Sequence, residues 1–458
     1  MIRVIISLVQ AHSKFNNGEE GTEMGFLNEF KESIKKKEIK VAVVGLGYVG
    51  LPLAIEFAKK GFLVFGVEID KDRLSHLMKR ETYISDVTSK ELRGVLRPGR
   101  LIPCGDFKSL KHADVIIVCV PTPLKRKYHP DISFIKEAIE SISRNLKRGS
   151  LIILESTTYP GTTEEVILPL LEKRGLRHGR DFYLCFSPER IDPGNLRFPV
   201  SKIPKIIGGV NKDAGLLGKA VYEVIVERAV MVSSTRVAEI TKLLENTFRI
   251  VNIGLVDEMA MMAHKMNIDI WEVIDAASTK PFGFMPFYPG PGVGGHCIPK
   301  DPLYLYWKAK KFGFNSRFIK LASDVISFMP EYVVKRVGAV LKGKGINLHN
   351  SKVLLVGVTY KKDIKDLRKS PALDIIEILR KAKAQVAYHD PLVPYLKFPN
   401  LNLKSLALNK ANLMKFDCTI IATNHSSLDY GLILNNAKSI FDTRNVYIGK
   451  ANRNIVRL

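Results

Sequence analysis

The sequence has no apolar run of the roughly 18 to 20 residues that a membrane-spanning helix needs. No small-residue cleavage pattern follows the short apolar stretch near its N-terminus, so a secretory signal is not expected. Hydrophobic residues at 46% and charged residues at 25% are typical of a water-soluble globular protein. We therefore expect a cytoplasmic protein, and its 458 residues predict two or three domains.

Cysteine is scarce, and the five cysteines form an odd number without the spacing of a disulfide framework or a metal site. Cys119, Cys185 and Cys418 lie in strand-like apolar stretches, so we expect reduced core residues. Cys104 has no partner at a suitable spacing. Cys297 stands apart in PGPGVGGHCIPKDP, residues 289–302, where glycine and proline surround it.

Acidic residues are also few: 46 Asp and Glu stand against 70 Lys and Arg, which gives a formal net charge of +24. This excess indicates nucleic-acid binding, an anionic substrate, or a basic surface with no specific partner. The basic residues are spread over the whole length, without aromatic interleaving or zinc-finger spacing. That spread favours a small nucleotide-like substrate. A nucleic-acid-binding protein with an NAD-sensing fold remains the alternative of another class.

Strand and helix patterns alternate in the first half of the chain. A buried-strand pattern at residues 39–45 runs into a glycine-rich turn and a helical pattern that ends at Gly61, and a second strand follows at 62–70. Further strands are expected at 113–121 and 150–156. Such alternation predicts a parallel, doubly wound, Rossmann-like sheet.

The pattern changes to one long helix at residues 233–267, and a second helical region extends to about residue 341. Strand signatures return from residue 351. We therefore expect two Rossmann-like α/β domains around a helical middle that forms a dimer or higher oligomer. The predicted divisions are an extension at 1–38, of which 1–23 is dispensable if Met24 is the natural start, then domains at 39–232, 233–345 and 346–458.

The turn GLGYVG has the spacing GxGxxG at Gly45, Gly47 and Gly50, between a strand and a helix. Such glycines let backbone N–H groups approach a pyrophosphate. Glu68 ends the next strand and can accept hydrogen bonds from both ribose hydroxyls, which favours NAD over NADP. Arg73, one helical turn later, could instead neutralise a 2′-phosphate. A tight turn needed only for packing is the alternative.

The loop before Cys297 contains Gly290, Gly292, Gly294 and Gly295. If its amides point inward, they form a nest that lowers the pKa of a nearby thiol or binds an anionic oxygen. Alternatively, the cysteine only fills a corner behind a bend. His296 could be a base, although a hydrogen-bonded scaffold residue is the commoner case. Asp301 could activate water or serve as a helix cap.

Two polar side chains share a face of the long helix, because Lys242 and Asn246 are four residues apart. Directed together at a pocket they could stabilise an oxyanion, although such residues are usually solvated. Glu189 lies on a proline-flanked loop after a predicted strand, and Thr157 ends another strand, positions where α/β enzymes bind ligands.

These stretches together resemble the nucleotide-sugar 6-dehydrogenases, the relatives of UDP-glucose dehydrogenase, from about residue 38 onward. The resemblance implies a four-electron oxidation of a sugar C6 alcohol to a carboxylate, which consumes two NAD⁺ and one water. It implies that Cys297 is the nucleophile that forms a thiohemiacetal and then a thioester. Lys242 and Asn246 would stabilise oxyanions, Asp301 would assist proton transfer, and Glu189 would serve thioester hydrolysis.

Other family positions match residues of this sequence. The resemblance implies NAD contacts by Gly45, Gly47, Tyr48, Val49, Gly50, Glu68, Arg73, Pro121, Thr122 and Thr157, with Thr157 also near the catalytic water. It implies nucleotide-sugar contacts by Glu189, Arg190, Lys242, Asn246, Gly294 and Lys361.

The runs YPGTTEEV, FSPERIDPGN and GGHCIPKDP most resemble the UDP-N-acetylglucosamine 6-dehydrogenase branch, which serves microbial surface-polysaccharide pathways. UDP-N-acetylmannosamine, UDP-glucose and GDP-mannose dehydrogenases share the core residues, so these substrates remain alternatives. A two-electron alcohol dehydrogenase in which Cys297 is structural is a further rival.

Overall fold

The computed structural model describes residues 25–84, 87–125, 128–192, 197–398, 401–450 and 452–458. They form two compact units, Met1–Leu243 and Leu244–Leu458. The expectation about residues 1–23 lies outside the described residues. No helix in the described ranges is both long and apolar enough to cross a bilayer.

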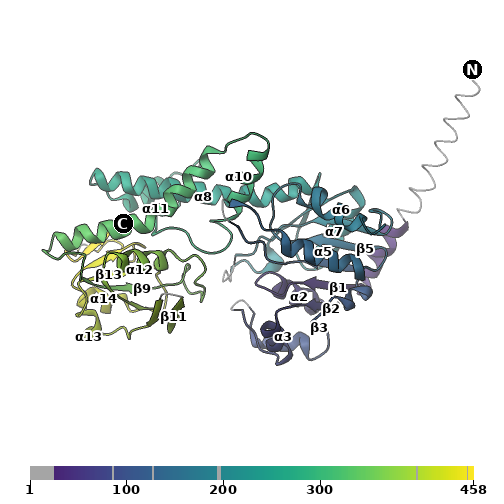
Figure 1. Cartoon of the computed structure of the whole chain (residues 1–458), viewed down its shortest axis with the longest axis horizontal. Coiled ribbons are helices and arrows are strands. Elements are labelled where there is room, and N and C mark those ends of the chain that lie inside the picture. Colours follow the sequence, from purple (N-terminus) through teal and green to yellow (C-terminus); the bar gives the residue numbers. More distant parts are fainter. Residues whose placement is uncertain (1–24, 85–86, 126–127, 193–196, 399–400, 451) are drawn as a thin grey trace, which may run out of the picture. The chain divides into compact units, whose positions relative to one another are not determined.

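The first unit contains an eight-stranded sheet with the order β3-β2-β1-β4-β5-β6-β7-β8 (Figure 1). Strands β1 to β6 pair in parallel, as the alternating pattern predicted. The carboxyl ends of these strands therefore lie along one edge of the sheet, where such folds bind ligands. The strands are β1 (Lys40–Val44), β2 (Leu63–Val67), β3 (Leu101–Cys104), β4 (Val115–Val118), β5 (Ser150–Leu154), β6 (Phe182–Phe186), β7 (Lys205–Gly209) and β8 (Ala229–Val232).

Strand β7 departs from the parallel pattern, since it runs antiparallel to β6, with Cys185 opposite Gly209 and Phe186 opposite Gly208. A parallel neighbour requires a crossover, commonly a helix of a dozen or more residues. Between β6 and β7 the described residues contain only the short 3₁₀ helix η4 (Val200–Lys202). The chain therefore reverses direction, and the first residue of β7 lies beyond the last residue of β6.

Alternate residues of the central strands face two separate cores. Val41, Val43 and Ile117 pack with α2 (Gly50–Lys59) and α7 (Lys212–Tyr222) on one face. Ala42 and Ile116 pack with α5 (Ser133–Asn145) and α6 (Leu168–Glu172) on the other. Both faces are thus apolar and covered by helices, which is why these strands read as continuous hydrophobic runs. Between the strands also lie η1 (Lys108–His112) and the π-helical turn η3 (Thr163–Ile167).

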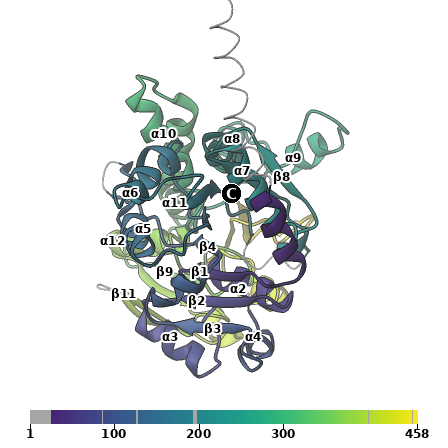
Figure 2. The same ribbon diagram turned by 90° about the vertical axis from the view of Figure 1, so that its right-hand side faces the viewer.

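A helix at residues 25–35 precedes the first strand. Its Phe30 and Ile34 are buried in the same core as α2, so this part of the expected extension packs with the first sheet. Helices α3 (Lys71–Met78) and α4 (Ser89–Leu96) lie beside β3, the edge strand that begins the sheet order (Figure 2).

The predicted long helix is confirmed as α8 (Thr235–Lys265), 31 residues that cross the boundary between the two units. Three more helices of the second unit follow: α9 (Ile270–Ser278), α10 (Asp301–Lys311) and α11 (Arg317–Lys342). Gly254 of α8 packs closely on Ala322 of α11, since a Cβ atom at Gly254 would lie 3.0 Å from the Ala322 Cα.

A second parallel sheet follows, with the order β10-β9-β13-β14-β15. Helices α11 and α12 (Pro371–Lys381) cover one face, and α13 (Lys410–Leu413) and α14 (Tyr430–Asn436) cover the other (Figure 1). The sheet strands are β9 (Lys352–Val356), β10 (Gln385–His389), β13 (Cys418–Ile421), β14 (Ile440–Asp442) and β15 (Ile455–Arg457), and β11 (Tyr395–Phe398) pairs with β12 (Leu401–Lys404) in a hairpin. The two doubly wound α/β folds expected from the sequence are confirmed.

The turn after β9 gives a stability prediction. Gly357 has φ +80°, and a Cβ atom there would lie 2.2 Å from the carbonyl oxygen of Thr423. We expect Gly357→Ala to lower the free energy of unfolding by about 2 kcal/mol or more, because both backbone strain and a backbone clash must be accommodated. Denaturant titration of the variant measures this loss.

The matched control is Gly338→Ala in α11, whose added methyl group would meet only Leu348 Cδ2 at 3.7 Å. Alanine is the better helix former, so this variant should be unchanged or more stable by about 0.5 to 1 kcal/mol. Equal losses at both positions would contradict the explanation for Gly357.

Candidate active site

The glycine turn connects β1 to α2, and its outer glycines are required by the backbone. Gly45 has φ +90° and donates its N–H to Val67 O at 2.8 Å. A Cβ atom at Gly50 would lie 1.9 Å from the Gly45 oxygen. Gly47 differs, because a Cβ atom there would meet only Arg73 Nη1, at 3.8 Å. The middle glycine therefore leaves open space beside the N-terminal end of α2, where a pyrophosphate fits.

Glu68 follows β2, and its side chain is almost fully buried. It accepts hydrogen bonds from the backbone N–H groups of Leu46, at 3.1 Å, and Asp70, at 3.0 Å. Arg73 Nη1 lies 3.4 Å from the same carboxylate. The acid thus joins the glycine turn to the end of the second strand, where a ribose would lie, and Arg73 is paired with it. These residues fit NAD.

Two more loops follow the carboxyl ends of neighbouring strands. Pro121 and Thr122 follow β4, and Thr157 follows β5, which pairs with β4 in parallel. Ser156 Oγ donates to Val120 O at 2.8 Å and so ties one loop to the other. Thr122 is buried, Thr157 is half-buried and Pro121 is exposed. Of the remaining predicted NAD contacts, Val49 occupies the N-cap position of α2 without a side-chain cap hydrogen bond, and Tyr48 packs against the core.

The predicted hydrolytic residue Glu189 lies after β6 in a buried polar cluster. Its Oε1 accepts hydrogen bonds from the N–H groups of Arg190, at 2.6 Å, and Ile191. Burial raises the pKa of the Glu189 carboxyl, and Lys242 of α8 opposes that rise through its charge. Lys242 is itself buried, and its charge acts on Glu189. The guanidinium of Arg190 points elsewhere and donates to Pro204 O at 2.7 Å.

Lys205 was missed by the sequence reasoning. It begins β7, and its ammonium lies 3.3 Å from Glu189 Oε2 and in contact with Glu155 Oε1. Burial lowers the pKa of Lys205 to about 7. One sequence feature could have indicated it: Lys205 is the first residue of KIIGG, a strand that otherwise contains only apolar residues and glycine.

The loop before Cys297 does not form the predicted nest at two of its glycines. The N–H of Gly290 donates to Asp257 Oδ1 at 3.0 Å, and the N–H of Gly295 donates to Arg368 O at 2.8 Å. A Cβ atom at Gly294 would lie 2.5 Å from the Cβ of Tyr360. Close packing accounts for these glycines, and a substrate contact at Gly294 stays a prediction.

All five cysteines are free thiols, and Cys297 alone is exposed. Burial raises the pKa of Cys119 and Cys418 to about 12 and raises that of Cys185 further, as expected for core residues. Among the residues described, no group of three His, Cys, Asp or Glu side chains is arranged to hold a metal ion.

Cys297 lies in the turn that leads into α10. Its carbonyl accepts hydrogen bonds from the N–H groups of Lys300, at 3.0 Å, and Asp301, at 2.8 Å. The buried Asp301 carboxylate accepts from Asn246 Nδ2 at 2.6 Å, which fixes the cysteine turn to α8. Three predicted site residues, Cys297, Asp301 and Asn246, are therefore brought together.

Lys300 supplies a charge that the sequence reasoning did not assign. Burial lowers the pKa of Lys300 to about 8, against the charges of Asp301 and Cys297, which raise it. The interaction is mutual, so the Lys300 ammonium favours the thiolate form of Cys297. Lys300 Nζ lies 2.7 Å from His296 Nε2, and burial followed by the Lys300 charge lowers the pKa of His296 to about 4. His296 is thus a neutral acceptor for Lys300 at neutral pH, which agrees with a scaffold role.

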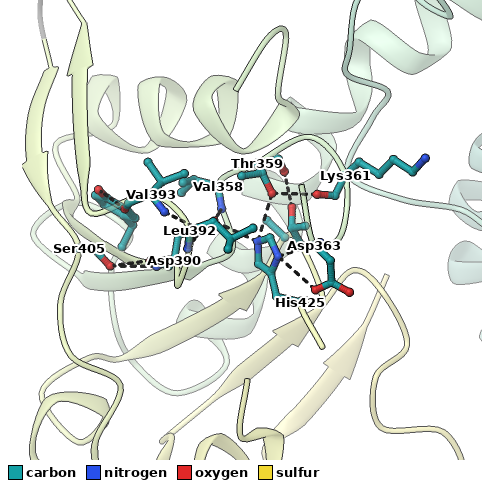
Figure 3. A network of polar contacts seen from close by, with 12 residues as sticks. Val358, Thr359, Lys361, Asp363, Asp390, Leu392, Val393, Ser405 and His425 are labelled. Carbon is teal, nitrogen blue, oxygen red and sulfur yellow. Dashed lines mark hydrogen bonds and ion pairs between the residues drawn. The ribbon is translucent and has the colours of Figure 1, made fainter. Parts of the chain in front are cut away.

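Lys361 lies in the loop after β9, which a buried histidine organises (Figure 3). The Asp363 N–H donates to His425 Nδ1 at 3.0 Å, so the other ring nitrogen, 3.1 Å from Asp390 Oδ2, carries the proton. Thr359 Oγ1 donates to Lys361 O at 3.0 Å. The loop backbone is held from within, while the Lys361 side chain points away from the network. This arrangement suits a cation that contacts a phosphate.

Comparisons with known proteins agree with this geometry. The sequence matches the UDP-glucose/GDP-mannose dehydrogenase family in its NAD binding domain over residues 39–226, its central domain over 236–326 and its UDP binding domain over 354–449. It is 41% identical to the UDP-N-acetyl-D-glucosamine 6-dehydrogenase of Pseudomonas aeruginosa over 78% of this chain and 84% of that protein.

Two further likenesses concern another sugar. The chain is 36% identical to the UDP-N-acetyl-D-mannosamine dehydrogenase of Pyrococcus horikoshii over 84% of this chain and 90% of that protein. The solved structure of the UDP-D-ManNAc dehydrogenase from P. horikoshii matches with a TM-score of 0.82 at 34% identity, and covers 92% of this chain and 98% of that one.

The glycine turn gives a prediction about coenzyme binding. Gly47→Ala should leave the melting temperature unchanged, since its methyl group has room in the protein. It should weaken NADH binding by roughly tenfold or more, because the methyl group occupies the space that the pyrophosphate needs. NADH fluorescence titration and a thermal melt measure the two effects.

Gly50→Ala is the contrasting variant, since its methyl group would clash with the Gly45 oxygen and should lower the melting temperature as well. If Gly47→Ala binds NADH normally, the turn is not the coenzyme site.

Proposed function

Because the chain belongs to the UDP-glucose/GDP-mannose dehydrogenase family and is an NAD-dependent nucleotide-sugar dehydrogenase, we propose that it oxidises the C6 hydroxyl of a UDP-N-acetylhexosamine to the uronic acid. UDP-N-acetylglucosamine is the first candidate, since the relative at 41% identity carries that name. UDP-N-acetylmannosamine is the alternative that other relatives support, ahead of UDP-glucose and GDP-mannose.

The observation that carries the proposal is the exposed Cys297 thiol beside the Lys300 ammonium. A neighbouring cation favours the thiolate, which is the nucleophilic form of cysteine. The other cysteines lack this combination, because burial raises the pKa of all four: Cys104, Cys119, Cys185 and Cys418. This contrast argues against the rival two-electron alcohol dehydrogenase, in which Cys297 is structural.

In the proposed mechanism the C6 alcohol is first oxidised to an aldehyde. The thiolate of Cys297 then adds to the aldehyde carbon and gives a thiohemiacetal, whose oxidation gives a thioester. NAD⁺, when bound, accepts one hydride from C6 in each oxidation, so two are consumed per sugar. Water then attacks the thioester carbonyl, the C6–S bond breaks, and the uronic acid leaves.

Residues of α8 and the cysteine turn would stabilise the oxyanions. Lys242 and Asn246 are both buried, and each can donate a hydrogen bond to a negative oxygen at C6. Asp301 holds Asn246 at 2.6 Å, which supports a role in orienting that donor and in proton transfer. Glu189 would accept the proton of the attacking water, and Thr157 would bind near it.

The nucleotide part of the substrate would be held by the second unit. Residues 354–449 match the UDP binding domain of the family. His425 and Asp390 fix the loop that carries Lys361, so the backbone of Lys361 is held in place while its ammonium binds a ligand. A diphosphate is a suitable ligand for such a cation.

We further propose that the chain forms a homodimer through α8. Its exposed apolar side chains include Leu244, Leu255 and Met262, at spacings of 11 and 7 residues. These spacings repeat along one side of a helix, and such a stripe is typical of helix pairing between subunits.

A panel of UDP-N-acetylglucosamine, UDP-N-acetylmannosamine, UDP-glucose and GDP-mannose tests the reaction and the substrate together. We expect two NADH per molecule of sugar acid, with the highest kcat/KM for UDP-N-acetylglucosamine. NADH absorbance and chromatography of the product measure both. One NADH per sugar would overturn the four-electron mechanism, and a preference for another sugar would overturn only the substrate.

Cys297→Ser tests the nucleophile. A hydroxyl group has a far higher pKa than a thiol, so we expect acid formation to fall by at least about 1,000-fold. Cys104→Ser is the control, because Cys104 is only half-buried and lies outside every proposed role. Product assays on both variants measure the difference, and unchanged turnover of the Cys297 variant would remove it from the mechanism.

Leu255→Glu/Met262→Glu tests the dimer. Each apolar side chain contributes roughly 1.5 to 3 kcal/mol when buried, so two acids per subunit should raise the dimer dissociation constant by more than about 100-fold. Sedimentation velocity measures the shift, with Lys265→Glu as a control on the same helix. A variant that stays dimeric would place the interface elsewhere.

A further inference from the structure

The cluster around Lys205 contains two buried acids and one buried base. Lys205 Nζ contacts Glu155 Oε1 and lies 3.3 Å from Glu189 Oε2. The exposed fractions of the three side chains are 4% for Lys205, 0% for Glu155 and 10% for Glu189. A buried charge is costly unless it is paired, and these two acids are the partners that offset the cost for the ammonium.

The reversal of β7 explains how Lys205 reaches this place. Phe186 pairs with Gly208, and the antiparallel register continued past the end of β6 puts Lys205 opposite Glu189. A parallel β7 would have put its first residue at the other edge of the sheet. The antiparallel direction of β7 thus places Lys205 at the edge of the sheet where the carboxyl ends of the parallel strands lie.

Other groups face the ammonium from neighbouring elements. From α7, Tyr222 donates its hydroxyl to Glu155 Oε2 at 2.9 Å, and its ring lies 5.0 Å from Lys205 Nζ. After β4, Cys119 Sγ lies 3.9 Å from the same Glu155 oxygen. The charges of Lys242 and Arg190 also act on Glu189. Burial lowers the pKa of Lys205 most, the charge of Cys119 raises it and that of Lys242 lowers it further. The contact with the Glu155 carboxylate and the Tyr222 ring favour the ammonium form.

We propose that Lys205 is a positioning residue for thioester hydrolysis, whose ammonium group holds the Glu189 carboxylate ionised and in a fixed orientation. This inference rests on the proposed function, which assigns the hydrolytic step to Glu189. Lys205 is too deeply buried to contact a sugar, so its effect passes through Glu189.

The geometry leaves Glu189 restrained at both oxygens. Oε1 accepts two backbone N–H groups, and Oε2 faces the ammonium. In the hydrolytic step a water oxygen bonds to the thioester carbon, the water proton passes to Glu189, and the C6–S bond breaks so that sulfur leaves as the Cys297 thiolate. A base can take that proton only when it is ionised, and burial alone works against ionisation of Glu189.

Lys205→Met, which removes the charge but keeps most of the side-chain length, is the direct test. We expect the two oxidations to continue and hydrolysis to slow on the order of 100-fold, so that the Cys297 thioester accumulates. Rapid quenching followed by intact mass measurement detects the adduct, and NADH fluorescence follows the oxidations. The acidic limb of the hydrolysis rate should move to higher pH by about one unit or more, because Glu189 loses its cation.

Because Lys205→Met leaves the buried Glu155 carboxylate unpaired, Glu155→Gln/Lys205→Met is made alongside it. Folding is checked by thermal melts and NADH binding. Lys202→Met, an exposed lysine of η4, is the matched control and should hydrolyse normally. Lys205→Arg restores a cation and should recover the wild-type pH limb, a rescue that a purely structural role does not predict.

The outcomes separate the two proposals. Normal hydrolysis with an unshifted pH limb in a folded Lys205→Met or double variant overturns the role of Lys205 alone. If the wild type forms no Cys297 adduct and one NADH per sugar, the proposed function itself fails. A thioester that accumulates in the Lys205 variants and in Glu189→Gln, but not in Lys202→Met, supports both.

Discussion

Parallel strand pairing is the constraint on which the first unit depends. Because β1, β4, β5 and β6 pair in register in one direction, the loops that follow them lie along one edge. Residues from four distant stretches, Gly47, Thr122, Thr157 and Glu189, therefore follow neighbouring strands. The apolar packing on both faces of the sheet fixes the position of this edge.

Much of this arrangement follows from sequence. The long helix and both α/β folds were predicted from periodicity, because burial on both faces leaves a strong apolar pattern. The glycine turn was predicted from the spacing of its glycines. The isolation of Cys297 among the cysteines was also visible. The sequence could not show Lys300 acting on that thiol, since it depends on a side-chain direction set by the turn into α10.

One wrong prediction and one missed feature have physical reasons. The glycines near Cys297 were interpreted as a nest of free amides, yet those of Gly290 and Gly295 bind Asp257 and Arg368, which are remote in sequence. The reversal of β7 was likewise hidden, because strand direction depends on the length and path of the connection rather than on the strand residues. Lys205 remained unnoticed for that reason, since its neighbours depend on the reversal.

The continuity of α8 has a consequence for how this chain can change over evolutionary time. Lys242 and Asn246 stand one turn apart on an unbroken helix, so their spacing along its axis is about 6 Å whatever happens elsewhere. Inserting or deleting a single residue between them would rotate one against the other by about 100°. Substitutions can therefore accumulate along α8, but an insertion or deletion between Lys242 and Asn246 would separate the two side chains and is not tolerated.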